Sequence, residues 1–431
     1  AIEKLELTYS DLLSYDLSAY TGLISLNLSG NDGIMFDLSQ VPNLKTLNLN
    51  NMSLNSLDLT HLNQLERLSV YNNLLTDIDI SHLNQLTYLD ISSNDLTSIA
   101  FTADQPIDNL NIANNKLTSL DVSALSVLNH LNAGGMSQLA NLVTSNESLA
   151  IDYINISDSS IINPDFTHLS FLRELDVSGM SSEKIDFAKL GNINYLRMDR
   201  SNLTSFDTAW VPSVERLSLE RNKLAQINIA NPEKLIRLQL ESNELTQLDT
   251  SGLVNLGTLW IPNNPISALD LTGLEKLWQL GLSGTDVAEI DVSNTPVLEY
   301  INAGNSAIQQ IQNLDSLQYT LRELWLDRAP LTTEMQDLLA DLSNQEGYGY
   351  IYYSYAHSVV VKTNEFGAVD ERRANTQGGN ITSISFTPNE GYKLGAYSGC
   401  ENMQYNEGNN WLNIGPITQS CELVLEFVTT N

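Results

Sequence analysis

Residues 65–75 read LERLSVYNNLL, and residues 86–96 read LTYLDISSNDL, 21 positions further on. The pattern returns at 235–245 as LIRLQLESNEL, within a unit of the form L-x-x-L-x-L-x-x-N-x-L-x-x-L-D-L-x-x-L-x-x. Sixteen copies begin at Ile2, Leu23, Leu44, Leu65, Leu86, Ile107, Leu128, Ile151, Leu172, Ile193, Val214, Leu235, Leu256, Leu277, Leu298 and Leu321. Thirteen of the fifteen spacings are 21 residues and two are 23, which predicts a solenoid of stacked coils over residues 1–331.

The two halves of the unit predict two different walls. In L-x-L, alternation turns the leucines inward and the intervening residues outward, so each coil adds one strand to a parallel sheet on the concave face. The second half, L-x-x-L-D-L, has no room for a long helix, so we expect short strands, turns or 3₁₀ pieces on the convex face. One coil cannot bury its leucines alone, and stacking supplies the core. The predicted fold class is a leucine-rich-repeat solenoid.

The doubled L-x-L, with its second copy written L-D-L, resembles the 21-residue bacterial repeat class called IRREKO. The matching segments are LDL (57–59), LDV (120–122), LDT (248–250), LDL (269–271) and IDV (290–292). The resemblance covers about residues 1–331. It implies the fold and says little about a ligand, because solenoids of this class share a core and differ on their surfaces.

Residues 332–356 predict a cap for the open end of the solenoid. In TTEMQDLLADLSNQ (332–345), Thr332 or Thr333 is a suitable N-cap, and the apolar residues at 335, 338, 339 and 342 fall on one face. We therefore expect an amphipathic helix. The following GYGYIYYSY (347–355) predicts one further strand, so helix and strand together would cover the sheet edge.

Residues 357–431 abandon the period and alternate in the manner of strands, which predicts a small all-β or α+β domain. This stretch resembles the β-rich bacterial modules related to the internalin B-repeat. The matching segments are FTPNEGYKL (386–394), SGC (398–400) and PITQSCELVLEF (416–427). In that family the two cysteines pair, so the resemblance implies a disulfide between Cys400 and Cys421. It also implies an exported bacterial protein without catalytic residues.

Composition limits the partners. The chain has 431 residues and a net charge of −31, which repels nucleic acid and anionic membranes. No apolar run approaches the ~20 residues that span a bilayer, so we expect no membrane insertion within this chain. The first residues, AIEKLEL, contain no basic-then-apolar leader. We expect a secreted or cell-surface protein whose signal sequence lies outside this chain.

No catalytic motif is present in the sequence: we find no G-x-x-x-x-G-K-[ST], H-E-x-x-H, G-x-S-x-G or C-x-x-C. We therefore expect no enzymatic activity and no cofactor. His61 and His82 occupy the same loop position of adjacent coils, where they could share a metal. The simpler interpretation, which we prefer, is two exposed turn histidines, because metal sites usually need further ligands.

Two polar columns recur once per coil. The aspartate of L-D-L could attract calcium, but it is usually followed two residues later by Ser, Thr or Ala, so it can also accept hydrogen bonds from its own turn. We prefer this second, structural interpretation. The asparagine at position 9 is predicted to satisfy buried backbone groups. Several coils replace it: Met52, Met136, Met180, Ser159, Ser201, Thr285, Ser306 and Ala329.

The outward strand positions 3, 5 and 7, with their flanks 2 and 8, are not dictated by the core, so they carry the functional information. The first eight coils show mostly Ser, Thr, Asn and Asp there, whereas arginines, acids and large aromatics appear from Leu172 onward. Arg, Tyr and Trp are enriched at binding hot spots. The candidate contact residues on the concave face are Arg173, Glu174, Tyr195, Arg197, Arg200, Arg216, Glu220, Arg221, Arg237, Trp260, Trp278, Tyr300 and Trp325.

Structural interpretations of the same residues remain open. In one of them, the arginines and acids form solvated cross-strand pairs, and each pair contributes little to the stability of the fold. In another, the C-terminal module covers Trp325 and Tyr300. Trp278 lies at the strand margin and could pack on a loop.

Three classes of function fit the sequence. We favour a protein that recognises a partner protein on a host or neighbouring cell and so acts in adhesion. A carbohydrate-binding adhesin is the alternative, because Trp and Tyr beside acids also suit sugar rings. The third class is an enzyme or a structural spacer without its own ligand.

Overall fold

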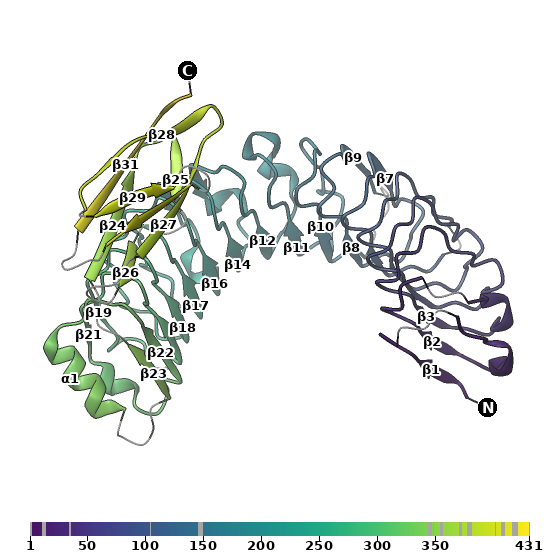
Figure 1. Cartoon of the computed structure of the whole chain (residues 1–431), viewed down its shortest axis with the longest axis horizontal. Helices are drawn as coiled ribbons and strands as arrows, with labels where there is room; N and C mark the ends of the chain where they lie inside the picture. Colours follow the sequence, from purple (N-terminus) through teal and green to yellow (C-terminus); the bar gives the residue numbers. More distant parts are fainter. Residues whose placement is uncertain are drawn as a thin grey trace. The chain divides into compact units, whose positions relative to one another are not determined.

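The structure is a computed structural model that describes residues 2–10, 14–33, 36–103, 105–144, 150–343, 347, 349–353, 357–369, 373–376, 382–400, 402–406, 410–415 and 421–430. The chain divides into two compact units, Ala1–Ser201 and Asn202–Asn431. Each unit contains stacked coils that contribute one short strand to a parallel sheet (Figure 1). The predicted leucine-rich-repeat solenoid is confirmed, together with a small β domain near the C-terminus.

In the first unit, each strand of the main sheet pairs with the strand of the next coil in constant register, as Leu47 pairs with Leu68 and Leu68 with Leu89. The strands are β1 (Lys4–Glu6), β2 (Ser25–Asn27), β3 (Thr46–Asn48), β4 (Arg67–Ser69), β5 (Tyr88–Asp90), β6 (Asn109–Asn111), β8 (His130–Asn132), β10 (Tyr153–Asn155), β11 (Glu174–Asp176) and β12 (Tyr195–Arg197). The second half of the coils carries the strand pair β7 (Ser119–Asp121) with β9 (Asn141–Val143) and the 3₁₀ turns η1 (Ser18–Tyr20), η2 (Leu38–Gln40), η3 (Ser182–Lys184) and η4 (Phe187–Lys189).

The second unit repeats this arrangement. Its main sheet contains β14 (Arg216–Ser218), β16 (Arg237–Gln239), β17 (Thr258–Trp260), β18 (Gln279–Gly281), β20 (Tyr300–Asn302), β22 (Glu323–Leu326) and β23 (Tyr350–Tyr353). The second half of its coils carries the pairs β13 (Ser205–Asp207) with β15 (Gln226–Asn228) and β19 (Glu289–Asp291) with β21 (Gln310–Gln312), and the 3₁₀ turns η5 (Thr208–Trp210), η6 (Pro232–Lys234) and η7 (Leu314–Leu317).

The core consists of the repeat leucines and their aliphatic substitutes. The predicted register turns eight residues inward, at the centre of four strands and directly after them, and none has any solvent exposure: Leu68, Val70, Leu89, Ile91, Leu217, Leu219, Leu238 and Leu240. Because these side chains all point inward, the residues between them point outward. The predicted register is therefore confirmed in both units.

The asparagines at position 9 form a buried hydrogen-bonded ladder. In the coil of Asn94, the side-chain amide donates to the carbonyl of Val70 in the preceding coil (3.0 Å) and to that of Ile91 in its own coil (3.1 Å). Its Oδ1 accepts from the backbone N–H of Leu75 (3.0 Å). Where Thr285 or Ser306 replaces asparagine, its hydroxyl donates to the carbonyl three residues earlier, at 2.7 and 2.6 Å. The predicted structural role of this column is confirmed.

The aspartates of L-D-L close the turns that follow them. In every one of them, Oδ1 accepts from the backbone N–H two residues later, as Asp79 does from Ser81 at 2.9 Å. The same bond is made by Asp16, Asp37, Asp58, Asp121, Asp165, Asp186, Asp207, Asp249, Asp270 and Asp291. The described residues contain no group of three His, Cys, Asp or Glu side chains placed to hold a metal ion. The hydrogen-bonding interpretation of this column is confirmed.

Helix α1 (Thr333–Leu342) follows the last repeat, and Thr332 is its N-cap, accepting from the N–H of Met335 at 3.1 Å. Met335, Leu339 and Leu342 are buried, which confirms the predicted apolar face. After the helix, β23 pairs in parallel with β22, so Tyr352 lies opposite Trp325. In the described part of the chain, no helix has the length and apolarity to cross a membrane.

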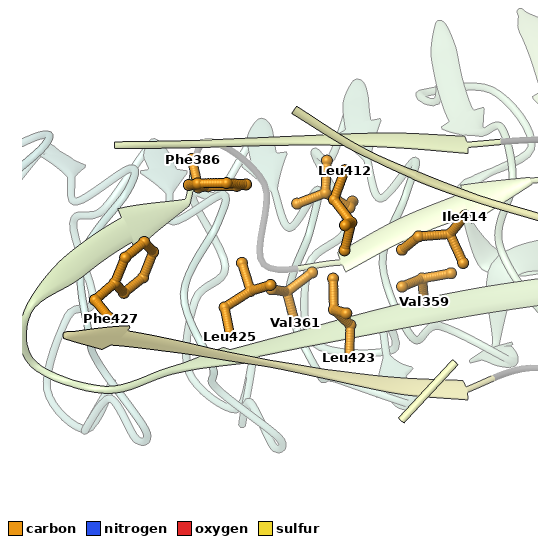
Figure 2. Close-up of a cluster of buried hydrophobic side chains, with 9 residues drawn as sticks. Val359, Val361, Phe386, Leu412, Ile414, Leu423, Leu425 and Phe427 are labelled. Atoms are coloured by element: carbon orange, nitrogen blue, oxygen red, sulfur yellow. The ribbon is translucent and has the colours of Figure 1, made fainter. Parts of the chain in front are cut away.

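The C-terminal β module contains two four-stranded sheets. One has the order β26 (Arg373–Thr376), β24 (His357–Thr363), β31 (Cys421–Thr429), β28 (Tyr392–Ser398), and the other β25 (Gly367–Val369), β27 (Thr382–Pro388), β30 (Trp411–Ile414), β29 (Met403–Asn406). Their inward side chains form one apolar core, in which Val361 and Leu425 face Phe386 and Leu412 (Figure 2).

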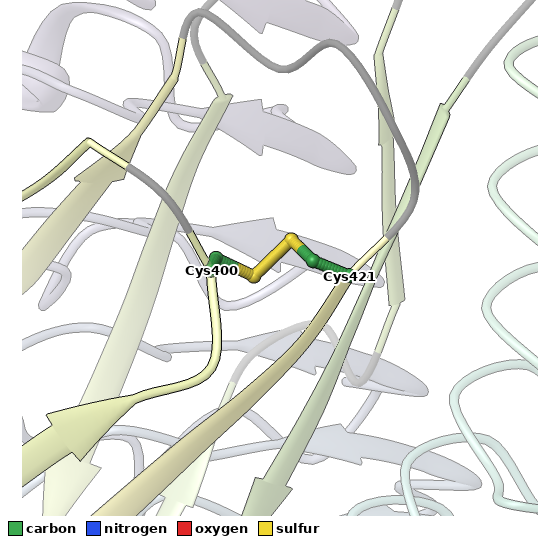
Figure 3. The surroundings of a disulfide bond; sticks show 2 residues. All are labelled: Cys400 and Cys421. Carbon is green, nitrogen blue, oxygen red and sulfur yellow. A yellow bond between two sulfur atoms is a disulfide. The ribbon is translucent and has the colours of Figure 1, made fainter.

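A disulfide joins Cys400, which follows β28, to Cys421, the first residue of β31, with Cα atoms 5.4 Å apart (Figure 3). Both cysteines pack against the apolar core of the module. The pairing implied by the sequence resemblance is confirmed.

Candidate functional site

The most aromatic outward surface of the main sheet lies in the second unit. We call it the aromatic patch, and it contains Trp260, Tyr300, Trp325, Tyr350 and Tyr352. Trp325 and Tyr352 stack with ring centroids 4.1 Å apart and planes inclined by 15°, while Trp260 and Tyr300 lie 6.4 Å apart. Tyr350 and Tyr352 stack at 6.2 Å. The patch thus contains two groups of rings, Trp260 with Tyr300 and Trp325 with Tyr352 and Tyr350, and aromatic rings bury much area per residue on binding.

Neighbouring residues fix the two indoles of the aromatic patch. The Nε1–H of Trp260 donates to Glu241 and that of Trp325 to Glu323, both at 3.0 Å. Trp260 also lies over Gly281, its neighbour in register on β18. The rings are therefore held in place before any partner binds, which lowers the entropy cost of binding.

Two members of the aromatic patch are largely accessible. Tyr350 is 70% and Tyr352 42% exposed, while Trp260, Tyr300 and Trp325 are half-buried. Burial and the nearby carboxylate of Glu323 raise the pKa of Tyr300, so its hydroxyl is neutral at ordinary pH. Trp325 packs on Tyr352, a residue of the neighbouring strand.

Trp278 does not belong to this patch. It lies at position 2, at the strand margin, and its Nε1 would be 3.0 Å from a Cβ added to Gly257 of the preceding coil. The indole is 42% exposed. The structure therefore separates Trp278 from Trp260, Tyr300 and Trp325, with which the sequence had grouped it.

Arg216 and Arg237 of the second unit lie directly opposite each other on β14 and β16. Like charges in this register are unfavourable, and both side chains are half-buried. Glu220 accepts a hydrogen bond from Gln239 at 3.1 Å. Arg221 has a left-handed backbone, with φ 54°. This position is glycine or asparagine in many coils, and an arginine there is uncommon.

In the first unit, the predicted arginines form ion pairs. Arg173 lies 3.9 Å from Asp152, Arg197 2.6 Å from Asp199, and Arg200 3.2 Å from Asp158. The hydrogen bond that Arg197 donates to the carboxylate of Asp199 raises the pKa of Arg197. Because the pairs of Arg173 and Arg200 are exposed, they contribute little to stability.

Glu174 and Tyr195 are neighbours in register on β11 and β12. Together with the ion-paired arginines they form a surface that mixes positive, negative and aromatic side chains.

The first unit carries an aromatic column that the sequence analysis overlooked. At position 3, the guanidinium of Arg67 lies 4.1 Å from the ring centre of Tyr88, and His130 stacks on Tyr153 at 4.1 Å with planes inclined by 7°. Burial lowers the pKa of His130 and raises that of Tyr153, so both rings are neutral at pH 7. Reading position 3 alone down the aligned repeats would have shown this column.

The loop histidines make ordinary turn contacts. His82 Nε2 lies 3.0 Å from the carbonyl oxygen of Leu59, and His168 Nε2 lies 2.7 Å from the hydroxyl of Thr144. No metal-binding group involves them among the residues that the structure describes.

Comparison with known proteins supports the fold. No protein-family model and no curated protein matches the chain. Among solved structures, a leucine-rich-repeat protein of Leptospira interrogans is 19% identical with a TM-score of 0.63, covering 82% of this chain and 96% of its own. The functional domain of InlJ from Listeria monocytogenes, which includes a cysteine ladder, is 20% identical with a TM-score of 0.53, over 94% and 90% of the two chains.

YopM from Yersinia enterocolitica is 22% identical with a TM-score of 0.51, over 77% of this chain and 79% of its own. All three similar structures come from bacteria, and at these identities the likeness shows the leucine-rich-repeat fold alone. The present chain has no cysteine before Cys400, so its repeats cannot contain a cysteine ladder.

Proposed function

We propose that this chain is a secreted or cell-surface bacterial protein that recognises another protein through the outward, concave face of its main sheet. The aromatic patch of the second unit supplies the anchor. Two observations on the same sheet carry the proposal: the stack of Trp325 on Tyr352 and the tethered indole of Trp260. Aromatic residues held rigidly on a sheet lose little entropy on binding and bury much apolar area.

The arginines have a different part in this proposal. Arg216 and Arg237 lie opposite each other in register, so their two positive charges favour an anionic group of a partner. The ion-paired arginines of the first unit, with Glu174 and Tyr195, would affect the association rate, and so the salt dependence, more than the lifetime of a complex. The acidic surface elsewhere is unsuited to nucleic acid.

The experiment uses the full chain to capture proteins from surface extracts of host or neighbouring cells. A specific partner should be retained by the wild type and by Tyr319→Ala, which removes an 83% exposed tyrosine outside the patch. Trp260→Ala should raise the dissociation rate. Arg216→Ala should mainly slow association at low salt. The proposal fails if both variants bind like the wild type while Tyr88→Ala abolishes binding.

A carbohydrate ligand is the second candidate for the same patch. Its support is that each indole has a carboxylate beside it, Glu241 for Trp260 and Glu323 for Trp325, and carboxylates accept hydrogen bonds from sugar hydroxyls. A glycan array probed with the wild type and Trp260→Ala separates the two candidates: reproducible sugar binding lost in the variant favours this one.

A further inference from the structure

The C-terminal β module has an outer sheet face of unusual composition. In the sheet of β25, β27, β30 and β29, Ile384, Phe386, Leu412 and Ile414 point into the core and are buried. Alternation therefore turns Trp411 outward, and its side chain is 51% exposed. An exposed tryptophan at the start of a regular strand loses apolar burial that the fold could have used.

Among the described residues, polar and uncharged side chains lie next to Trp411 on both neighbouring strands. On the two neighbouring strands, Ser385 and Asn406 lie directly opposite it. Two residues along β30, Asn413 also points outward and lies between Ser383 and Gln404. The hydroxyl of Ser383 donates to Oδ1 of Asn413 at 2.6 Å. One large flat ring is thus bordered by hydroxyl and amide groups on the outer face of the sheet.

The four strands of this sheet contain no charged residue: their sequences are GAV, TSISFTP, MQYN and WLNI. The outer face of the other sheet is ordinary by comparison, since Lys362 and Glu422 form an ion pair there at 2.9 Å, with Lys393 and Glu426 also exposed. In a chain with a net charge of −31, one uncharged face with an exposed tryptophan indicates contact with a neutral ligand.

We infer that this face, which we call the Trp411 platform, binds a neutral polysaccharide. A pyranose ring has an apolar C–H face that packs on an indole, and its hydroxyls both donate and accept hydrogen bonds. Ser, Asn and Gln side chains offer both donors and acceptors. Anionic glycans and nucleic acids would find no cation on this sheet. The site is separate from the aromatic patch and does not depend on the function proposed for it.

The test is the electrophoretic mobility of the full chain in native gels that contain one polysaccharide each. The neutral probes are mannan, galactan and mixed-linkage β-glucan, and the anionic probes are heparin and hyaluronan. At least one neutral probe should retard the wild type, and neither anionic probe should. Trp411→Ala should weaken the retarding interaction about tenfold or more. Trp411→Tyr, which keeps a flat ring, should recover part of it.

Two matched variants make the result specific. Trp210→Ala removes a 42% exposed tryptophan of the repeats and should be retarded like the wild type. Trp260→Ala tests the aromatic patch. If the loss of retardation follows Trp260→Ala and not Trp411→Ala, a sugar site lies on the solenoid and the inference is wrong. It is also wrong if no neutral probe retards the wild type, or if a protein ligand proves to need Trp411 while no sugar does.

Discussion

The indole of Trp260 lies over the backbone of Gly281, its neighbour in register, so closely that a Cβ added there would be 2.3 Å from Cε3 of the ring. The absence of a side chain at residue 281 thus decides where the ring rests. In this position the ring centroid of Trp260 lies 6.4 Å from that of Tyr300, a residue two coils further along the chain.

Replacing Gly281 by alanine should displace Trp260 without unfolding the coil. The ring must move because the new methyl group overlaps it, and overpacking of this kind costs about 1–3 kcal/mol. We expect a red-shifted tryptophan emission and a loss of partner binding similar to that of Trp260→Ala. Gly304→Ala is the control, since its nearest atom is 3.4 Å away. Unchanged emission in Gly281→Ala would show that the ring does not need this space.

Asn243→Ala should reduce the free energy of unfolding by about 1–3 kcal/mol. The side chain is 2% exposed, and its Oδ1 accepts from the N–H of Leu224 at 3.0 Å, so the variant leaves a buried donor unsatisfied. The carbonyl of Leu240 would keep a second donor, Asn264, at 2.8 Å. Urea denaturation measures the change. Asn255→Ala, which removes a partly exposed asparagine bonded to the carbonyl of Glu233 and to Lys276, should change it by less.

Acid should destabilise the repeats through their turn aspartates. The hydroxyl and the backbone N–H of Ser81 hold the pKa of Asp79 below its ordinary value. Hydrogen bonds also lower the pKa of Asp16, Asp37, Asp58, Asp121, Asp165, Asp249, Asp270 and Asp291. A carboxyl with a lowered pKa in the folded state adds stability above its unfolded pKa, and this stability is lost as the pH falls through the folded value. Tm should therefore decrease steeply below about pH 4.

The contribution of these turns is separable from general charge effects. Asparagine can accept the same hydrogen bonds at every pH, so the triple variant Asp58→Asn, Asp79→Asn, Asp121→Asn should show a smaller decrease in Tm between pH 6 and pH 3. The variant Glu233→Gln, Glu275→Gln, Glu334→Gln removes three exposed carboxylates elsewhere in the chain. Equal Tm profiles for the two triple variants would contradict the prediction.

Loss of the Cys400–Cys421 disulfide should destabilise the C-terminal β module by roughly 3 kcal/mol, because the bond closes a loop of about 20 residues in the unfolded chain. Hydrogen exchange in β28 and β31 should accelerate in the variant Cys400→Ser, Cys421→Ser, while exchange in β4 and β5 stays unchanged. Intact mass before and after reduction establishes the bond in purified protein. Two free thiols in protein from an oxidising compartment would contradict the pairing and weaken the case for export.

Most of the fold is predictable from the sequence because the same residue types return at the same positions of each repeat. One alignment of the repeats assigns Leu68 to the core, Asn94 to the ladder and Asp79 to its turn, since each role recurs at a fixed position. The helix after the repeats is equally predictable, because its cap and its apolar face lie within twelve consecutive residues, from Thr332 to Ser343.

The outward surface is less predictable, because it depends on side chains from different coils. That Trp260 leans over Gly281, or that Trp325 stacks on Tyr352, follows from ring orientations that no single repeat contains. The stack of His130 on Tyr153 was missed for the same reason: each residue is unremarkable among the serines and asparagines of its own coil.

The asparagine ladder is interrupted in several coils, and its longest interruption affects how the chain unfolds. Each asparagine ties its coil to the preceding one, but four consecutive coils have Met136, Ser159, Met180 and Ser201 in its place. In a quasi-linear array, stability is a sum of coil and neighbour terms, so weaker coupling localises opening. Under a pulling force or a limiting dose of protease, the coils from Leu128 to Ser201 would yield before those from Leu65 to Leu117.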